Sequence, residues 1–187
     1  ADTKDWLYLG MNNLNGQVVL AYFDLANGVV GSSLGADNVG TYIEDVGNGW
    51  YRCGVAFLAD ATDNNCNTLW GPADGDGDLT VDRDGVSSVL AYGFQGEDVS
   101  GAWDSENLLF HSNSFDVGPW STVGNRTITA DQAVAPDGTL TADELNTIDT
   151  ASSGVGGINQ NINLEAGRSY IFSVYMKAGS AGYAVFR

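Results

Sequence analysis

Alternation is the dominant pattern in this sequence and the feature that most constrains the fold of the chain. The alternation runs through residues 6–9, 18–25, 51–58, 89–94 and 170–176. A period of two places successive side chains on opposite faces of an extended backbone, so each segment predicts a half-buried antiparallel strand. Helical periodicity is hard to find, because Pro136 and Gly138 interrupt its best candidate, residues 129–145, before two turns are complete.

Short segments that combine Gly with Asn, Asp or Ala separate the expected strands. They include residues 24–28, 44–50, 73–78, 135–139 and 165–169. These residue types adopt the backbone conformations that tight turns need. With 25 glycines and only three prolines in 187 residues, the chain is expected to fold as an all-β, antiparallel β-sandwich.

Charge and length exclude several classes of function. The formal net charge of −17 repels phosphate backbones and anionic membrane surfaces, so we expect no nucleic-acid partner. No segment has the apolar length of a bilayer-spanning helix, so no membrane insertion is expected. A chain of 187 residues can form one well-filled domain, and a second full domain is not expected.

The two cysteines, Cys53 and Cys66, are expected to be free thiols. If residues 51–59 and 66–73 form a hairpin that turns around residues 63–65, Cys66 faces residues 58–60 and Cys53 lies at the far end. That separation exceeds the Cα–Cα distance of about 7 Å that a disulfide allows. We therefore predict two buried thiols, with no further Cys or His at a spacing suited to zinc.

The residues that usually carry catalysis are scarce. The single histidine, His111, lies in the segment NLLFHSNSF, which we expect to be a strand. No nucleophile elbow, metal triad or phosphate-binding loop is present. Carboxylate pairs could hydrolyse glycosides, but in so acidic a chain some pair lies at a suitable separation by chance. We predict no enzyme activity.

The acidic segment at residues 74–78, followed by Asp82 and Asp84, raises the question of calcium. Hard cations bind several carboxylate oxygens. A helical calcium loop needs a glycine where Leu79 stands and a bidentate glutamate where Gly85 stands. The segment is therefore interpreted as a solvated turn.

Several motifs resemble a known family. In the C-terminal part these are Asn107-Leu108-Leu109, Ser112-Asn113, Phe115-Asp116, Trp120, AVAPDGTLTADEL and FSVYMKAG. In the N-terminal part they are AYFDLANGVVG, IEDVGNGWYRCGVAF, GPADGDGD and VLAYGFQGE. Together they resemble the jelly-roll modules repeated in tail and fibre proteins of tailed bacteriophages. Those modules are similar to carbohydrate-binding modules with a galactose-binding-like sandwich.

The order of the two parts is reversed relative to that family. Residues 1–101 resemble the C-terminal half of the module, and residues 105–187 resemble its N-terminal half. A circular permutation, a window from a tandem array and an exchange of halves between chains would each give this order. The resemblance favours one jelly-roll domain over residues 1–187, permuted or strand-exchanged, with residues 183–187 beside residues 1–10.

The resemblance implies non-catalytic carbohydrate binding, with a polysaccharide or cell-surface glycan as the partner. Sugars stack on exposed aromatic rings, while nearby polar side chains select hydroxyl groups. Trp6 and Tyr8 share one face of a strand if Leu7 and Leu9 point inward, and Tyr92 and Phe94 offer a similar pair with Gln95 nearby. Trp6, Tyr8, Tyr92 and Gln95 are the candidate ligand residues. Trp50 and Trp120 lie in motifs typical of the core, and the negative charge favours a neutral glycan.

Related jelly rolls also imply a structural calcium ion, for which the candidate ligands are Asp116, Glu97 and Asp98. The alternative function is that of a virion structural protein, a capsid decoration or fibre subunit, with no glycan ligand. Its aromatic faces would then be buried against other copies of the chain or against virion neighbours. Both functions imply a virion or extracellular location.

Overall fold

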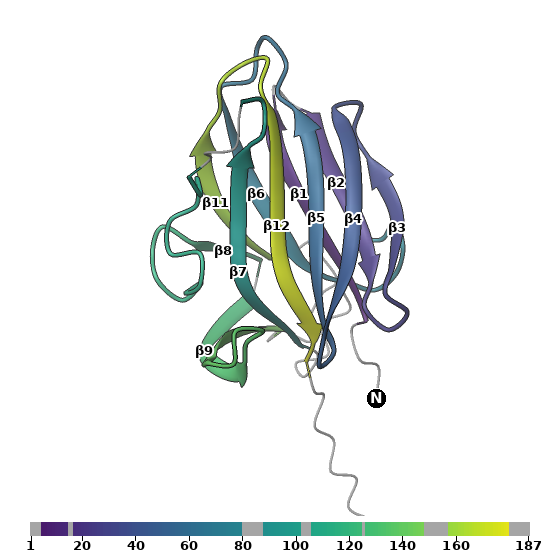
Figure 1. The fold of residues 1–187 in the computed structure, drawn as a ribbon, viewed down its shortest axis with the longest axis vertical. Coiled ribbons are helices and arrows are strands. Elements are labelled where there is room, and N and C mark those ends of the chain that lie inside the picture. Colours follow the sequence, from purple (N-terminus) through teal and green to yellow (C-terminus); the bar gives the residue numbers. More distant parts are fainter. Residues whose placement is uncertain are drawn as a thin grey trace, which may run out of the picture.

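The computed structural model describes residues 5–14, 17–79, 88–101, 106–124, 126–147 and 157–179. Within these residues, twelve strands and no helix are present, and the strands form two antiparallel sheets of six strands each. The sheets pack face to face (Figure 1). The predicted antiparallel β-sandwich is confirmed.

Each sheet draws its strands from distant parts of the chain. Sheet A has the order β3-β2-β1-β6-β11-β8, and sheet B has the order β4-β5-β12-β7-β10-β9. The strands of sheet A are β1 (Trp6–Leu14), β2 (Gln17–Asp24), β3 (Val29–Leu34), β6 (Asn65–Ala73), β8 (Ser121–Val123) and β11 (Gly157–Asn163). Those of sheet B are β4 (Asn38–Gly47), β5 (Trp50–Leu58), β7 (Ser88–Asp98), β9 (Arg126–Val134), β10 (Leu140–Thr147) and β12 (Ser169–Ala178).

Strands of the C-terminal part pair directly with strands of the N-terminal part. In sheet B, β12 is hydrogen-bonded to β5 on one side and to β7 on the other. In sheet A, β11 lies between β6 and β8. The predicted neighbours of residues 1–10, residues 183–187, are outside the described residues.

The core lies between the sheets and follows the alternation of the sequence. Leu7, Leu9 and Met11 of β1 face inward from sheet A, and Cys53, Val55 and Phe57 of β5 face inward from sheet B. Aromatic rings fill the centre, where Trp70 contacts Phe94 at a centroid distance of 6.5 Å and Phe115 at 5.3 Å. Burial of such large apolar side chains provides most of the stabilisation of a sandwich of this kind.

The segment with the best helical pattern forms a β-hairpin instead. Strands β9 and β10 pair across residues 135–139, where Gly138 has a φ of 87°. The Asp137 carboxylate accepts hydrogen bonds from the backbone N–H and the hydroxyl of Thr139. Proline and glycine therefore act here as turn residues, as the sequence predicted.

Both cysteines are free and buried, as predicted, but the hairpin used to predict this is wrong. Strand β5 lies in sheet B and β6 lies in sheet A, so the segment between them crosses the sandwich. A side-chain hydrogen-bond network in that segment, in which Asp63 accepts from the Asp60 N–H and Asp60 accepts from Thr62, turns the chain toward the other sheet. Burial raises the pKa of both thiols, that of Cys66 to about 12.

The segment that contains His111 is a loop and not the expected strand. The Asn107 side chain accepts from the N–H groups of Gly96 and Leu109 and donates to the Phe94 carbonyl. These bonds attach the start of the loop to β7 and divert its backbone from a sheet ladder. His111 itself is exposed and has a positive φ of 51°.

No helix long and apolar enough to cross a bilayer occurs in the part of the chain that the structure describes.

Candidate functional site

The first predicted ligand surface, Trp6 and Tyr8 on the outer face of β1, is not an open aromatic platform. The alternation is as expected, since Leu7 and Leu9 point into the core and Tyr8 points to the other face. Tyr8 is nevertheless 0% exposed and packs with Leu20, Tyr22 and Leu69. Burial raises the pKa of its phenol. The expectation that the Tyr8 ring is open to a ligand is therefore wrong.

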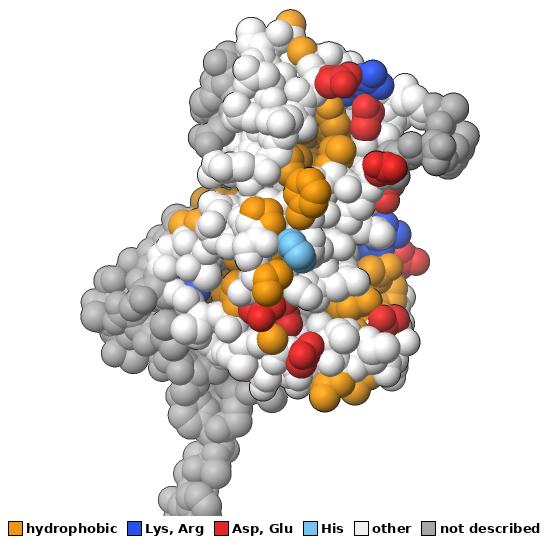
Figure 2. Space-filling view, turned by 90° about the vertical axis from the view of Figure 1, so that its left-hand side faces the viewer, with side chains coloured by type: hydrophobic (Ala, Val, Ile, Leu, Met, Phe, Trp, Pro, Cys, Tyr) orange, Lys and Arg blue, Asp and Glu red, His pale blue; other side chains and the backbone are white. Residues whose placement is uncertain are grey.

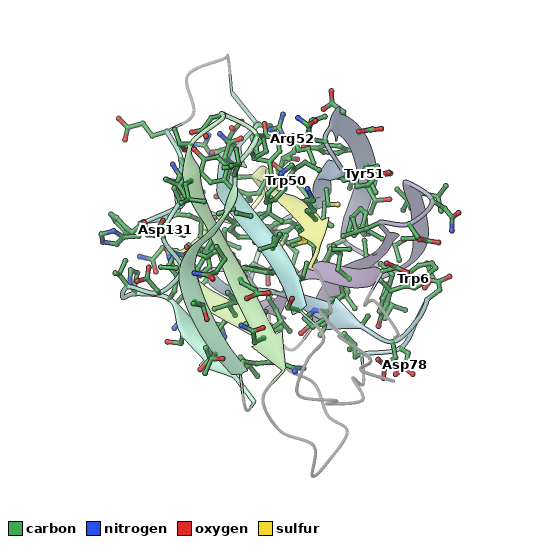
Figure 3. All side chains as sticks on the ribbon, turned by 90° about the horizontal axis from the view of Figure 1, so that it is seen from below. Trp6, Trp50, Tyr51, Arg52, Asp78 and Asp131 are labelled. Carbon is green, nitrogen blue, oxygen red and sulfur yellow. The ribbon has the colours of Figure 1, made fainter. Side chains whose placement is uncertain are left out.

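The acidic turn after β6 lies beside this face. Asp76 accepts hydrogen bonds from the backbone N–H and the hydroxyl of Ser32 at 2.6 and 2.8 Å, and Leu79 packs against the apolar cluster that contains Tyr8. The Trp6 ring lies against Gly31, since a Cβ at that glycine would be 2.6 Å from Cζ3 of Trp6. Figure 3 shows Trp6 and Asp78 together, away from Trp50 and Arg52. Asp82 and Asp84 are outside the described residues.

The second predicted surface, around Tyr92 and Gln95, lies on the outer face of sheet B. A bulge in β7 puts these two side chains on one face, because Gln95 pairs with Ser173 whereas Tyr92 pairs with Tyr175. Gly93, with a φ of 64°, occupies the bulge, where a backbone of positive φ suits glycine. The same bulge turns Phe94 into the core, so its predicted place beside Tyr92 on the surface is wrong.

Four residues, Tyr42, Arg52, Tyr92 and Tyr175, form a row across strands β4, β5, β12 and β7, which we call the tyrosine–arginine face. The Arg52 guanidinium carbon lies 6.0 Å from the centroid of the Tyr42 ring and 5.9 Å from that of Tyr175. The rings of Tyr92 and Tyr175 have centroids 6.4 Å apart. All four side chains are half-buried, so the row combines aromatic surface with one cation at the protein surface.

Two polar side chains hold the guanidinium in place. Ser173 Oγ accepts from Nε and Nη2 of Arg52 at 3.3 and 3.2 Å, and Gln95 Oε1 accepts from Nη2 at 3.1 Å. Glu44 is the cross-strand partner of Arg52, yet Arg52 forms no ion pair with any carboxylate among the described residues. Within those residues its Nη1 also has no hydrogen-bond acceptor, so two donors remain available to a ligand.

A glycine makes room for the outermost ring of the row. A Cβ at Gly54 would lie 2.2 Å from Cε1 and 2.3 Å from Cζ of Tyr42, so the ring lies directly on the backbone of β5. That close approach brings the Tyr42 ring toward Arg52, which is two residues before Gly54 on β5 and lies on the same face. Glycine is required here for space.

The Tyr92 phenol is anchored at the turn between β9 and β10. Its hydroxyl donates to Asp137 Oδ2 at 2.7 Å. Burial and this hydrogen bond raise the pKa of Tyr92 to about 12. The hydrogen bonds from Thr139, together with that from Tyr92, lower the pKa of Asp137. The hairpin thus fixes one end of the tyrosine–arginine face.

The two tryptophans assigned to the core are buried as predicted. Trp120 lies in the main core and donates from Nε1 to the His111 carbonyl at 2.9 Å. Trp50 lies on the outer side of sheet B, in a smaller apolar cluster with Leu90 and Ala135, and its Nε1 donates to the Val134 carbonyl. Lys177 lies over the Trp50 ring at 6.0 Å. Neither indole offers a free face.

The three predicted calcium ligands do not meet. Asp116 lies near Asp143, which is opposite Ala91 on β7. Glu97 is six residues farther along β7, which corresponds to about 20 Å of extended strand. Asp98 pairs with Arg168 at 3.1 Å. No group of three or more His, Cys, Asp or Glu side chains suited to a metal occurs within the described residues.

Comparison with protein-family models, with curated proteins and with solved structures finds no match for this chain. The resemblance to phage jelly-roll modules therefore remains a prediction.

Sequence reasoning found Tyr92 and Gln95 but missed Tyr42, Arg52 and Tyr175. Arg52 and Tyr175 lie in the motifs WYRCG and FSVYMKAG, where alternation alone assigns them to the outer face. The missing information was strand order, since β12 comes from the far end of the chain and pairs between β5 and β7. Only that order places Tyr175 between Arg52 and Tyr92.

Proposed function

We propose that this protein is a non-catalytic carbohydrate-binding module, carried at a virion or extracellular surface, and that glycans bind on its tyrosine–arginine face. The observation that supports this most is the state of Arg52. In a chain of net charge −17, this arginine lies between two tyrosine rings, is held by neutral side chains and has no carboxylate partner among the described residues.

The chemistry of the face suits a sugar. Tyrosine rings provide apolar surface for the C–H groups of a pyranose. The Nη1 donors of Arg52, which have no acceptor among the described residues, can bind ring or hydroxyl oxygens. Gln95 and Ser173 hold the guanidinium plane, so little side-chain entropy is lost on binding. The overall negative charge repels densely sulfated or phosphorylated glycans, which favours neutral ones.

Titration of wild-type protein and variants with a panel of purified polysaccharides tests the proposal. Arg52→Ala removes the donors and the cation, and a charge-assisted hydrogen bond contributes about 1.5–3 kcal/mol, so affinity should fall about tenfold to about a hundredfold. Lys177→Ala is the matched control, because it removes one positive charge from the same face of sheet B. The Lys177 side chain contacts Trp50 and the Asn48 carbonyl and is not part of the tyrosine–arginine face. This variant should bind as the wild type does.

Two results would contradict the proposal. If no polysaccharide of the panel binds the wild-type protein and light scattering shows a stable oligomer, the virion structural role becomes the better explanation. If glycans bind the wild-type protein, and Arg52→Ala and Lys177→Ala bind them with the same affinity as the wild type, the tyrosine–arginine face is not the binding site.

A further inference from the structure

A polar cleft lies away from the tyrosine–arginine face, at the border of sheet A. It has a volume of about 570 Å³. Its lining residues are Asn65, Asn67, Leu108, Phe110, Asn161, Ile162 and Asn163. None of them carries a charge, although 24 of the 187 residues are Asp or Glu. Figure 2 shows this side of the molecule, with orange hydrophobic side chains beside the pale blue histidine.

Four asparagines line the cleft in two cross-strand pairs. Asn65 pairs with Asn163, and Asn67 pairs with Asn161, along the register of β6 and β11. Side chains that are directly opposite have Cβ atoms about 5 Å apart, and the two pairs are about 7 Å apart along the strands. Four amides thus occupy an area comparable with a single sugar ring.

Most of these amides have no hydrogen-bond partner among the residues that the structure describes. Asn65 donates from Nδ2 to Asn64 Oδ1 at 2.8 Å. The side-chain amides of Asn67, Asn161 and Asn163 form no hydrogen bond with any described residue. Each amide offers both a donor and an acceptor, the combination that a sugar hydroxyl needs.

Phe110 adds an exposed aromatic ring to the cleft. It is 70% exposed, more than any other large hydrophobic side chain among the described residues. Its backbone is fixed by Gln160, which accepts from the Phe110 N–H and donates to the Phe110 carbonyl, both at 2.9 Å. Gln160 is itself buried in β11, next to Asn161.

The loop around Phe110 is held at several further points. Leu108 donates from its backbone N–H to the Gly96 carbonyl at 2.8 Å, and Ser112 accepts from the Phe94 N–H through its carbonyl at 2.9 Å. His111, next to Phe110, accepts from the Trp120 indole through its carbonyl. A large apolar ring kept in solvent by so many hydrogen bonds is preorganised for a ligand.

We propose that this cleft is a second saccharide-binding site, specific for a neutral pyranose, in which Phe110 stacks on the sugar and the asparagine amides bind its hydroxyl groups. The ligand class rests on the proposed function, whereas the location rests on the residues of the cleft alone. Because the lining and a neutral pyranose are both uncharged, binding here should not depend on ionic strength.

The test is calorimetric titration with neutral oligosaccharides of glucose, galactose, mannose and N-acetylglucosamine. Phe110→Ala and the double variant Asn67→Ala/Asn161→Ala should each lose at least tenfold in affinity at this site, while Arg52→Ala retains it. Leu140→Ala is the control for Phe110, because Leu140 is a similarly exposed apolar residue, at 61%, on β10. Thermal unfolding of each variant confirms that the fold is kept.

The outcomes separate the two proposals. Loss of binding in the cleft variants with retention in Arg52→Ala and Leu140→Ala supports the second site. Wild-type affinity in both cleft variants, with loss in Arg52→Ala, overturns the second site and leaves the proposed function standing. If no neutral oligosaccharide binds the wild-type protein, this inference fails, and the polysaccharide panel decides the proposed function separately.

Discussion

Replacement of Gly54 by alanine should disturb the tyrosine–arginine face without touching the core. The new Cβ would lie 2.2 Å from Cε1 of Tyr42, whereas carbon atoms in contact are about 3.5–4.0 Å apart. The ring must therefore move off the β5 backbone by more than about 1 Å, which changes its contact with Arg52. Overpacking of this kind costs about 1–3 kcal/mol, and the outer position of the ring places Gly54→Ala in the lower part of that range.

Gly40→Ala is the matched control for Gly54→Ala. Gly40 lies on the same face of the neighbouring strand, and the nearest atom to a Cβ added there would be the Ala56 Cβ, at an ordinary 3.9 Å. In the middle of a strand, glycine is less stabilising than alanine by about 0.5–1 kcal/mol. Gly40→Ala should therefore leave the free energy of unfolding unchanged or raise it. In a domain of this size, 1 kcal/mol changes Tm by about 2–4 °C, which scanning calorimetry resolves easily.

A double-mutant cycle isolates the clash. In a Tyr42→Ala background the ring is gone, so adding Gly54→Ala should no longer lower the free energy of unfolding. Affinity for a glycan should fall in Gly54→Ala and stay unchanged in Gly40→Ala. If Gly54→Ala raised Tm in the wild-type background as Gly40→Ala does, the reasoning from the Tyr42 contact would be refuted.

Two further predictions concern buried groups. Cys53 and Cys66 should not react with a thiol reagent such as DTNB in the folded protein, and both should react in guanidinium, because burial raises both pKa values; rapid labelling of either thiol in the native state would contradict this. Burial also raises the pKa of Asp143, so its contribution to stability is largest below the ordinary carboxyl pKa and is lost as pH rises through the folded-state pKa. The free energy of unfolding of the wild type minus that of Asp143→Asn should therefore decrease from about pH 3 to about pH 7 in urea titrations, and a difference that rises over this range would show the sign to be wrong.

Alternation predicted five strands, although in β1 and β2 both faces are buried. The five segments lie on β1, β2, β5, β7 and β12, except that Leu25 follows the end of β2. Strands in which apolar and polar positions differ less clearly were not predicted. In β11, the sequence GINQNIN does alternate, but its outer positions are asparagines and the inward Gln160 is polar, so the apolar signal is weak.

The loop of residues 107–120 shows where local pattern misleads. Its apolar residues Leu108 to Phe110 resemble a strand, but the Asn107 side chain binds the backbone of β7, and Phe110 points to solvent. An asparagine that competes with the sheet for backbone groups is visible in a sequence. Its partners on β7, at Gly96 and Phe94, are known only from the fold.

Some features of the candidate ligand residues could be predicted from the sequence, whereas others depend on contacts that only the fold provides. The sequence predicted which face of β1 carries Tyr8. It could not predict the burial of Tyr8, because the residues that cover the ring, Tyr22, Leu69 and Leu79, come from three other segments. Tyr92 and Gln95, three positions apart, share a face only because of the bulge at Gly93. A glycine inside a strand is a recognised bulge signal, so this grouping could be reached from sequence.

The most direct measurement is isothermal titration of the wild-type protein, Arg52→Ala and Lys177→Ala with the same set of purified polysaccharides. We predict saturable binding by the wild type and by Lys177→Ala, with a loss of about tenfold or more in Arg52→Ala. Binding by all three with equal affinity would remove the tyrosine–arginine face from consideration, and the absence of binding by the wild type would contradict a carbohydrate-binding function.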